Sequence, residues 1–333
     1  MISENHPEVK YGKTGIVLIN LGTPDTTSWL DIRKYLKEFL SDRRVIEVNP
    51  IIWQVILNLF ILTFRPSKTA KAYKEIWMND INKSPLRFYT EMQARKLSEK
   101  MRESSLHIDF AMRYGNPSIK SKIYKMQEQG CENLIIVPLY PQYAAATTAT
   151  VCDEVYRTLM KMRWQPSLQI ISHYESEPKY INALKNSIEK KISEINWQPD
   201  LILASYHGIP QKYFDKGDPY HCYCQKTSRL LAESFKKIPI KTTFQSRFGP
   251  QAWLQPYTDK TLEKLPNEGT KNLLVICPGF ASDCVETLEE ISIQGKDSFI
   301  KSGGKNFDVV QCLNDNDDHI ELLADLINKY ITR

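Results

Sequence analysis

Short apolar runs rich in β-branched residues recur along the chain, and longer stretches of mixed polar and apolar residues separate most of them. These separating stretches are long enough for the crossover helices that connect parallel strands. The pattern therefore predicts an α/β fold whose parallel sheets are covered by helices on both faces. The predicted strands lie at 15–20, 107–112, 133–137, 168–171, 201–205, 241–245, 272–277 and 307–312.

The second half of the chain repeats features of the first. The sequence RYGNP at 113–117 is matched by RFGP at 247–250, and GCENL at 130–134 is matched by GTKNL at 269–273. An apolar strand, a turn with proline and the start of a helix follow in both halves. Two similar α/β halves, as a duplication would produce, are therefore predicted to face each other across a cleft.

A polar break at 164–166 separates a helical pattern from a strand pattern and predicts the boundary between the halves. The first half is then expected at 1–165 and the second at 166–313. A polar run at 314–318 begins an amphipathic helix at 314–333. This helix is expected to join the first half, although its pattern would suit packing on either one.

The composition is that of an ordinary soluble protein, with 333 residues of which 42% are hydrophobic and 25% charged. A net charge of +5, from 44 basic and 39 acidic residues, is too small to indicate a nucleic-acid partner. Seven cysteines, an odd number, favour reduced thiols over a disulfide framework. Residues 1–14 are polar and lack the apolar stretch of a signal peptide, which predicts a cytoplasmic protein.

The longest apolar stretch, 51–64, is interrupted by Gln54 and Asn58 and is shorter than the roughly 20 residues of a membrane span. We therefore expect no transmembrane segment. Pro50 and Pro66 bracket the stretch, and several basic residues follow it. One interpretation is a buried core helix. The other is an apolar lip that touches lipid or a flat apolar ligand, with the basic residues placed for carboxylates or anionic headgroups.

Candidate chemistry lies where two of the predicted strands end. The run at 201–205 leads to His207, and the run at 272–277 leads through a Pro-Gly turn to Asp283, Glu286 and Glu290. The spacing i, i+3, i+7 places these three carboxylates on one face of an α-helix. If both runs are strands of one sheet, the histidine and the acids emerge at the same edge, where open α/β sheets bind ligands. An imidazole facing carboxylates suits a proton acceptor, a divalent metal site, or both.

Each of these features also has an ordinary structural interpretation. An acidic stripe is commonly a solvated helix face, and a histidine at a strand end is commonly a satisfied polar residue. The stripe here directly follows a buried strand, which favours a site. Carboxylates packed into a cleft repel each other, so at least one is expected to have a raised pKa and to be able to carry protons.

Two other classes of site are not supported by the sequence. Cys222 and Cys224, next to His221, lack the second ligand pair of a zinc site, and we interpret them as part of a surface loop. The chain has neither a G-x-G-x-x-G motif nor a Walker A lysine, which argues against nucleotide binding.

With these motifs in this order, the chain resembles the ferrochelatases, which insert ferrous iron into a porphyrin to make haem, from about residue 15 to 312. The resemblance implies two Rossmann-like halves around a central porphyrin cleft, the type II chelatase fold. The matching segments are LGTP at 21–24, RY at 113–114, PLYPQY at 138–143, SYHGIP at 205–210, KGDPY at 216–220, QSRFGP at 245–250 with Trp253, and the acidic segment at 282–290.

The resemblance also implies roles for individual residues. His207 and Glu286 match the catalytic pair that faces the porphyrin and the metal, and Asp283 and Glu290 match the acidic path for protons or metal that leads away from it. Family positions near the porphyrin and its propionates are Leu21, Arg65, Tyr73, Ser84, Arg113, Tyr114 and Trp253. The apolar lip of the pocket mouth corresponds to Ile51, Ile52, Trp53, Ile56, Phe60 and Phe64.

Departures from the family pattern refine the expectation. Cys284 replaces a second histidine of animal relatives. Ala145 replaces a cysteine that those relatives use for an iron-sulfur cluster, and no cysteine follows Cys312, so no cluster and no other cofactor is expected. Leu21 stands where coproporphyrin-using relatives typically carry tyrosine, which favours protoporphyrin IX as the substrate.

The expected function is therefore insertion of Fe²⁺ into protoporphyrin IX to form protohaem, the terminal step of haem biosynthesis. The expected partners are the porphyrin and ferrous iron, with peripheral contact to the inner membrane or to another haem-pathway enzyme. Alternatives are insertion of iron into coproporphyrin III or of cobalt into a sirohydrochlorin-like ring, and a porphyrin or haem carrier without turnover. A periplasmic metallophore-binding protein is disfavoured because no signal peptide is expected.

Overall fold

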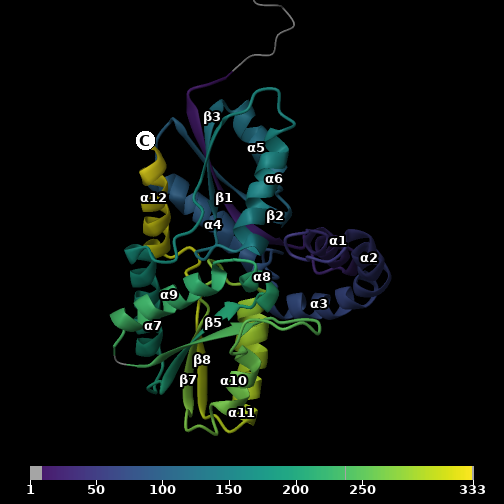
Figure 1. Ribbon diagram of the computed structural model, residues 1–333. Helices are drawn as coiled ribbons and strands as arrows, with labels where there is room; N and C mark the ends of the chain where they lie inside the picture. The colour runs from purple at the N-terminus through teal and green to yellow at the C-terminus, as the bar shows by residue number, and fades with distance from the viewer. Residues whose placement is uncertain (1–9, 237, 332–333) are drawn as a thin grey trace, which may run out of the picture.

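Two four-stranded parallel sheets with the same strand order form the frame of the protein (Figure 1). The computed structural model describes residues 10–236 and 238–331. In the first sheet the order is β2-β1-β3-β4, and in the second it is β6-β5-β7-β8. All eight predicted strands are confirmed, and the matching orders agree with the predicted duplication. The strands are β1 (Lys13–Thr23), β2 (Leu106–Gly115), β3 (Cys131–Pro138), β4 (Ser167–Ile170), β5 (Leu201–His207), β6 (Ile240–Gln245), β7 (Asn272–Ile276) and β8 (Asn306–Val310).

Helices cover both faces of each sheet, as parallel strands require. In the first half they are α1 (Trp29–Leu40), α2 (Pro50–Ile56), the π-helix η1 (Leu57–Ile61), α3 (Leu62–Ile76), α4 (Pro85–Lys100), α5 (Ile119–Glu128), the π-helix η2 (Ala145–Ala149) and α6 (Thr150–Leu159). In the second half they are α7 (Pro178–Glu194), α8 (Gln211–Asp215), α9 (Tyr220–Ser234), α10 (Thr258–Lys264), the π-helix η3 (Glu286–Gly295), α11 (Lys296–Lys301) and α12 (Asp317–Ile331).

The boundary between the halves lies later than the predicted position at 165. Strand β4 pairs with β3 in the first sheet, with Ile136 opposite Ile170. The polar break at 164–166 is therefore the turn between α6 and β4, and the chain leaves the first half only after β4, before α7. A local turn signal marks the end of a helix, but it carries no information about which sheet the next strand joins.

Helix α12 contacts α4 of the first half and α7 of the second, so it belongs to both halves rather than to the first alone. Its apolar face joins a core cluster that includes Leu18 of β1 and Ile202 of β5. Residues 332–333 of the predicted helix lie outside the described residues. Because this cluster reaches both sheets, burial of apolar surface stabilises the arrangement of the two halves that forms the site.

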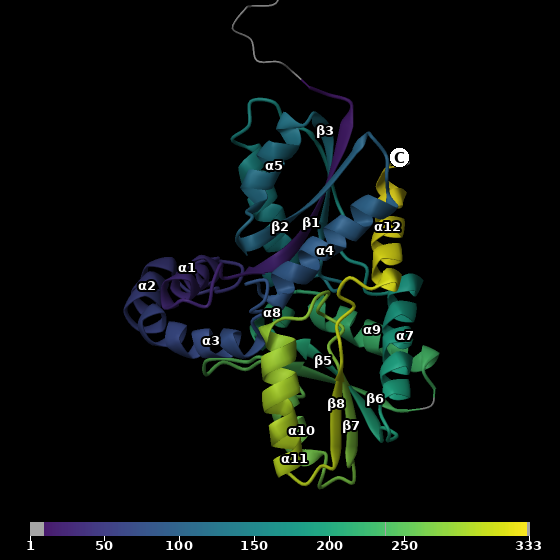
Figure 2. The ribbon, with the colours of Figure 1, turned by 180° about the vertical axis from the view of Figure 1, so that it is seen from behind.

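Helices α1 to α3 project from one side of the molecule, near the level where the two halves meet (Figures 1 and 2). The segments α2, η1 and α3 form one helix from Pro50 to Ile76, which continues through Pro66. A proline inside a helix removes one backbone hydrogen bond. Here the inner side of the helix is held by burial of Leu62, Pro66 and Tyr73 beside α1, which compensates for that loss.

The outer side of this helix is exposed and apolar. Ile51 is 79% exposed and Phe64 72%, and Ile52, Ile56 and Phe60 are exposed as well. The interpretation as a buried core helix is therefore wrong, and the exposed residues form a lip. Trp53 is the exception among the predicted lip residues, because its Nε1 donates to the Leu40 carbonyl at 2.6 Å and its ring is half-buried.

By length and composition, the 27-residue helix Pro50–Ile76 could cross a membrane, with a mean hydropathy of 1.2 and 17% burial in its most apolar window. This differs from the expectation that no segment would be long enough. The difference arises because the helix extends 12 residues beyond Phe64.

Candidate active site

His207 is the last residue of β5 and is half-buried. Its Nδ1 lies 2.6 Å from the carbonyl oxygen of Gly208. A carbonyl can only accept a hydrogen bond, so Nδ1 carries the proton of the neutral ring, and the lone pair of Nε2 is left to accept a proton or bind a metal. The backbone here approaches β6 closely: a Cβ at position 208 would lie 2.9 Å from the Gln245 carbonyl oxygen. Glycine at 208 therefore lets the chain turn directly after the histidine.

The three acids do not share one α-helical face as predicted. Asp283 lies in the turn before the helix, and η3 is a π-helix that begins at Glu286. Its wider turns change which side chains lie above one another, so spacing rules for an α-helix do not apply. Glu286 and Glu290 both lie in the first half of η3, and the charges of Glu286 and His207 both act on Glu290.

Glu290 accepts hydrogen bonds from the backbone N–H of Ser246 at 2.8 Å and from its Oγ at 2.5 Å. Burial raises the pKa of the Glu290 carboxyl, and the nearby charge of Glu286 adds to the rise. The Ser246 hydrogen bonds and the charge of His207 oppose the rise in this pKa. One acid of the stripe thus has the raised pKa that was expected for carboxylates packed into a cleft.

Asp283 is buried, and both oxygens of its carboxylate accept hydrogen bonds. Its carboxylate accepts from Asn314 Nδ2 at 2.7 Å and from Thr287 Oγ1 at 3.0 Å. The backbone carbonyl of Asn314 also accepts a hydrogen bond from Gln93 Nε2 at 2.7 Å. Since Gln93 lies on α4, this network ties the acid segment of the second half to the first half.

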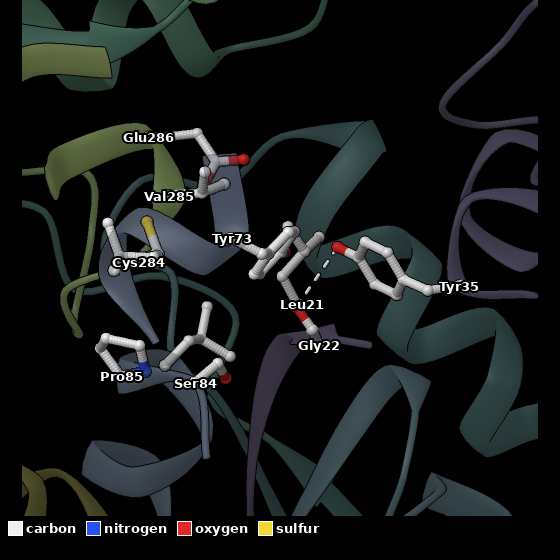
Figure 3. Close-up of a pocket in the computed structure, with 11 residues that line it drawn as sticks. Leu21, Gly22, Tyr35, Tyr73, Ser84, Pro85, Cys284, Val285 and Glu286 are labelled. Atoms are coloured by element: carbon white, nitrogen blue, oxygen red, sulfur yellow. Dashed lines mark hydrogen bonds between the residues drawn. The ribbon is translucent and has the colours of Figure 1, made fainter. Parts of the chain in front are cut away.

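A narrow recess of about 10 Å³, room for about one water molecule, lies between the halves (Figure 3). It brings together four of the predicted site residues, namely Leu21, Tyr73, Ser84 and Glu286. Sequence reasoning did not assign Gly22, Tyr35, Ile76, Pro85, Leu86, Cys284 and Val285 to it. Ser84 caps α4 by accepting from Arg87 N at 3.3 Å, so its own O–H can donate to a ligand.

The wall around Leu21 depends on a glycine with a left-handed backbone. Gly22 has φ of 115°, and a Cβ there would lie 1.8 Å from the Tyr114 carbonyl oxygen. Tyr35 donates its hydroxyl proton to the Gly22 carbonyl at 3.3 Å, as the dashed line in Figure 3 shows. Burial raises the pKa of both Tyr35 and Tyr73, so these phenols stay neutral and serve as walls and hydrogen-bond donors.

Arg113 and Tyr114 do not reach the recess, although both were predicted to lie near the porphyrin propionates. The Arg113 guanidinium is buried and paired with Asp42, and its Nε donates to the Thr150 carbonyl at 2.8 Å. Tyr114 is fully buried, and its hydroxyl donates to the same Asp42 carboxylate at 3.0 Å. In this structure these residues fix the loop that leads from α1 toward the lip.

Arg65 and Trp253 form a group of their own around Phe248. The Arg65 guanidinium lies over the Phe248 ring at 5.4 Å, and the Phe248 and Trp253 rings are 5.0 Å apart. Trp253 is buried and pairs with Pro210, just after the histidine turn. This group therefore connects the exposed start of α3 with the segment that follows His207.

The comparison with known families decides the classification. The ferrochelatase family model matches residues 13–331. The chain belongs to the ferrochelatase family. A ferrochelatase of Allorhizobium ampelinum is 52% identical over 98% of this chain and 96% of its own length. A ferrochelatase of Francisella tularensis subsp. novicida is 50% identical over 97% of this chain and 97% of its own length. One of Rhizobium meliloti is 52% identical over 97% of this chain and 96% of its own length.

Solved structures agree at the level of the fold. SirB from Bacillus subtilis, determined with Fe³⁺, superposes with a TM-score of 0.57 at 10% identity, over 95% of each chain. CbiX, the terminal enzyme of sirohaem biosynthesis in denitrifying bacteria, gives a TM-score of 0.52 at 11% identity, over 95% of this chain and 98% of its own. The ferrochelatase chain thus has the expected type II chelatase fold.

The cysteines near His221 do not lie in the surface loop that we predicted. Cys222 and Cys224 are in the first two turns of α9, where Cys222 is exposed and Cys224 is buried. Residues two apart on a helix do not face each other, so these thiols point in different directions. Across 10–236 and 238–331, no group of three or more His, Cys, Asp or Glu side chains is arranged to hold a metal ion.

Glu290→Gln is expected to stabilise this ferrochelatase at pH 8 while slowing its reaction. Burial raises the pKa of Glu290 in the folded state, so its stabilising contribution is present below the ordinary value of 4.5 and is lost as the pH rises through the folded value. Glutamine removes the buried charge. The midpoint of thermal unfolding should therefore rise at pH 8 and match that of the wild type below pH 4.5.

The matched control is Glu289→Gln, which removes the neighbouring carboxylate from the same helix and should leave the midpoint unchanged. A Glu290→Gln variant whose unfolding midpoint at pH 8 is no higher than that of the wild type would contradict the assignment of a destabilising buried charge.

Proposed function

We propose that this protein inserts Fe²⁺ into protoporphyrin IX to form protohaem, the terminal step of haem biosynthesis, through the residues at its interlobe recess. The observation that carries the proposal is His207 at the end of β5, whose Nδ1 is held by the Gly208 carbonyl so that Nε2 is available, together with Glu286 in the lining of the recess. Membership in the ferrochelatase family supports it. The metal here is a substrate, held only during the reaction.

The reaction requires a porphyrin that is bent, because a flat ring hides its pyrrole lone pairs from the metal. Rigid walls such as Leu21, Tyr35 and Tyr73 can impose this bend with binding energy from the rest of the ring. As Fe²⁺ enters, two pyrrole N–H bonds break and two protons leave. The two positive charges that the iron brings thus replace the two that the protons carry away. Those protons need acceptors at the recess.

We assign the acceptors as follows. His207 takes protons at Nε2, and Glu286 assists at the recess and can ligate the metal with His207. Glu290, with its raised pKa, receives protons from them. Asp283, which is held by hydrogen bonds from Asn314 and Thr287, is the next residue of the proton path beyond Glu290.

The lining of the recess favours protoporphyrin over coproporphyrin. Coproporphyrin III carries two more carboxylates, which need cationic or hydrogen-bonding partners. Among the described residues that line the recess, none is Lys or Arg, and Leu21 and Leu86 are apolar. Anaerobic iron insertion with each porphyrin in turn tests this choice. A higher kcat/KM for coproporphyrin III would keep the chemistry and overturn the substrate.

We also propose that the exposed lip rests on the cytoplasmic surface of the inner membrane, where an apolar porphyrin is dissolved. The lip is followed on α3 by the exposed cations Lys68, Lys71 and Lys74, which suit anionic headgroups. A peripheral contact is favoured over a membrane span because the other side of the same helix, with Leu57, Leu62 and Tyr73, is packed in the core.

Phe60→Glu combined with Phe64→Glu is expected to weaken binding to vesicles of anionic phospholipid at least about tenfold, since each aromatic ring loses apolar burial. Co-sedimentation measures the effect. The control is Met160→Glu, which changes an apolar side chain that is 81% exposed at the end of α6, outside the lip. Equal loss of binding in the control would show that the lip is not the contact.

No cofactor of the protein's own is proposed. The exposed Cys222 and the buried Cys224 point in different directions, which does not suit a shared cluster. Cys222→Ser with Cys224→Ser should leave both turnover and the visible spectrum unchanged. Loss of a visible chromophore in that variant would overturn this part of the proposal.

A further inference from the structure

The end of strand β6 lies between the histidine and the acids. Gln245, its last residue, pairs with His207 of β5, and the Gln245 carbonyl accepts from Gly208 N at 2.8 Å. Ser246 follows with φ of 65°, a left-handed conformation that is unfavourable for a residue with a Cβ. Such conformations persist where the surrounding structure requires them, which is common at functional sites.

The side chain of Gln245 ties the start of η3 to the sheet. It is buried, and its Nε2 donates to the Glu286 carbonyl at 2.8 Å. Its Oε1 accepts from Ser205 Oγ at 2.6 Å. Both ends of the amide are thus used, and the amide has one orientation that satisfies both partners. The backbone of Glu286 is therefore fixed relative to β5, which carries Ser205 and His207.

Ser246 fixes Glu290 in the same way, but through its carboxylate. The backbone N–H of Ser246 donates to Oε1 and the hydroxyl donates to Oε2, so one residue holds both oxygens. Two donors on one carboxylate prevent it from rotating. The N–H and the hydroxyl of Ser246 therefore lie on the same side of the residue, facing Glu290. The adjacent residues Gln245 and Ser246 thus hold two of the acids of η3: Glu286 is held by its backbone carbonyl and Glu290 by its carboxylate.

We propose that Gln245 and Ser246 are positioning residues, which hold Glu286 and Glu290 in a fixed arrangement with His207 so that proton transfer needs no rearrangement of these groups. The inference rests on the proposed function. Neither residue needs to touch the porphyrin for this role, since both act through groups that do the chemistry. Prealigned groups raise the rate of the chemical step without tightening substrate binding.

The central test compares Ser246→Gly with Ser246→Asn. Both residues tolerate the left-handed backbone, but only asparagine offers a side-chain donor in place of the hydroxyl. Ser246→Gly is expected to lower kcat for anaerobic iron insertion about 10- to 100-fold, the effect of one hydrogen bond to a charged group. The KM for porphyrin should stay within about twofold. Ser246→Asn should recover most of the lost rate.

A double-mutant cycle shows whether Ser246 acts through Glu290. In a Glu290→Gln background, Ser246→Gly should cause little further loss, because the carboxylate that it positions is already gone. Independent, additive losses would overturn the proposal. Gln245→Met, which has a similar shape but no amide, gives a second variant in which kcat alone should fall.

The controls separate the possible failures. Unchanged thermal unfolding and unchanged porphyrin fluorescence quenching show that Ser246→Gly keeps its fold and its binding site. If the wild type inserts iron and Ser246→Gly has the same kcat, the positioning role is overturned. The proposed function would be unaffected by that result. A wild type without turnover on protoporphyrin IX or coproporphyrin III would overturn the proposed function itself.

Discussion

His207→Ala is expected to lower the rate of iron insertion about 10²- to 10⁴-fold, the range for loss of a positioned general base. Its Nδ1 is held by the Gly208 carbonyl, so the neutral ring presents only Nε2 to the site. His221 of α9 differs from His207, because its ring stacks on the Phe244 ring of β6. Anaerobic assays of protohaem formation measure the loss.

Porphyrin binding by the His207→Ala variant should be close to that of the wild type, because the walls of the recess come from other residues. Fluorescence quenching on titration with protoporphyrin IX measures this. His173→Ala is the matched control, since His173 is a partly exposed histidine paired with Glu175 outside the recess. Normal turnover by His207→Ala would remove the histidine from the mechanism.

Glu286→Gln is expected to lower kcat by about 10²-fold, the lower end of the range for a proton-transferring group. The substitution keeps the shape of the side chain, and Gln245 still holds the backbone at position 286. The carboxylate charge at the recess is lost, and with it the ability to accept a proton or to ligate the metal. Steady-state kinetics with varied porphyrin and varied Fe²⁺ resolve kcat from both KM values.

The two possible duties of Glu286 give different kinetics. If it ligates the metal, the KM for Fe²⁺ rises in Glu286→Gln together with the fall in kcat; if it only accepts protons, the fall is confined to kcat. Glu289→Gln serves as the control on the same helix and should have wild-type kinetics. A Glu286→Gln variant with unchanged kcat would contradict its place in the catalytic pair.

The strands could be predicted because buried parallel strands are nearly continuous apolar runs, which a sequence displays directly. The same runs located His207, which is the last residue of β5, and the acidic segment, which follows β7. The position of the boundary could not be predicted in this way. Whether β4 joins the first or second sheet depends on pairing with β3, a contact between distant segments that no local pattern records.

The site was predicted in part for a related reason. The recess does bring together Leu21, Tyr73, Ser84 and Glu286. Arg113 instead forms an ion pair with Asp42, a residue far away in the sequence. The π-helical form of η3 also escaped prediction, because an acidic stripe at i, i+3, i+7 reads as an α-helix. Asp42 lies in the loop between α1 and α2, and no local pattern in the sequence indicated that it would pair with Arg113.

The measurement that tests the central claim most directly is an anaerobic reaction of the wild-type protein with Fe²⁺ and protoporphyrin IX, followed by absorbance and by release of protons. The account predicts formation of protohaem over many turnovers, with two protons released for each iron inserted. Tight binding of the porphyrin without formation of haem would contradict the account and would indicate a porphyrin carrier.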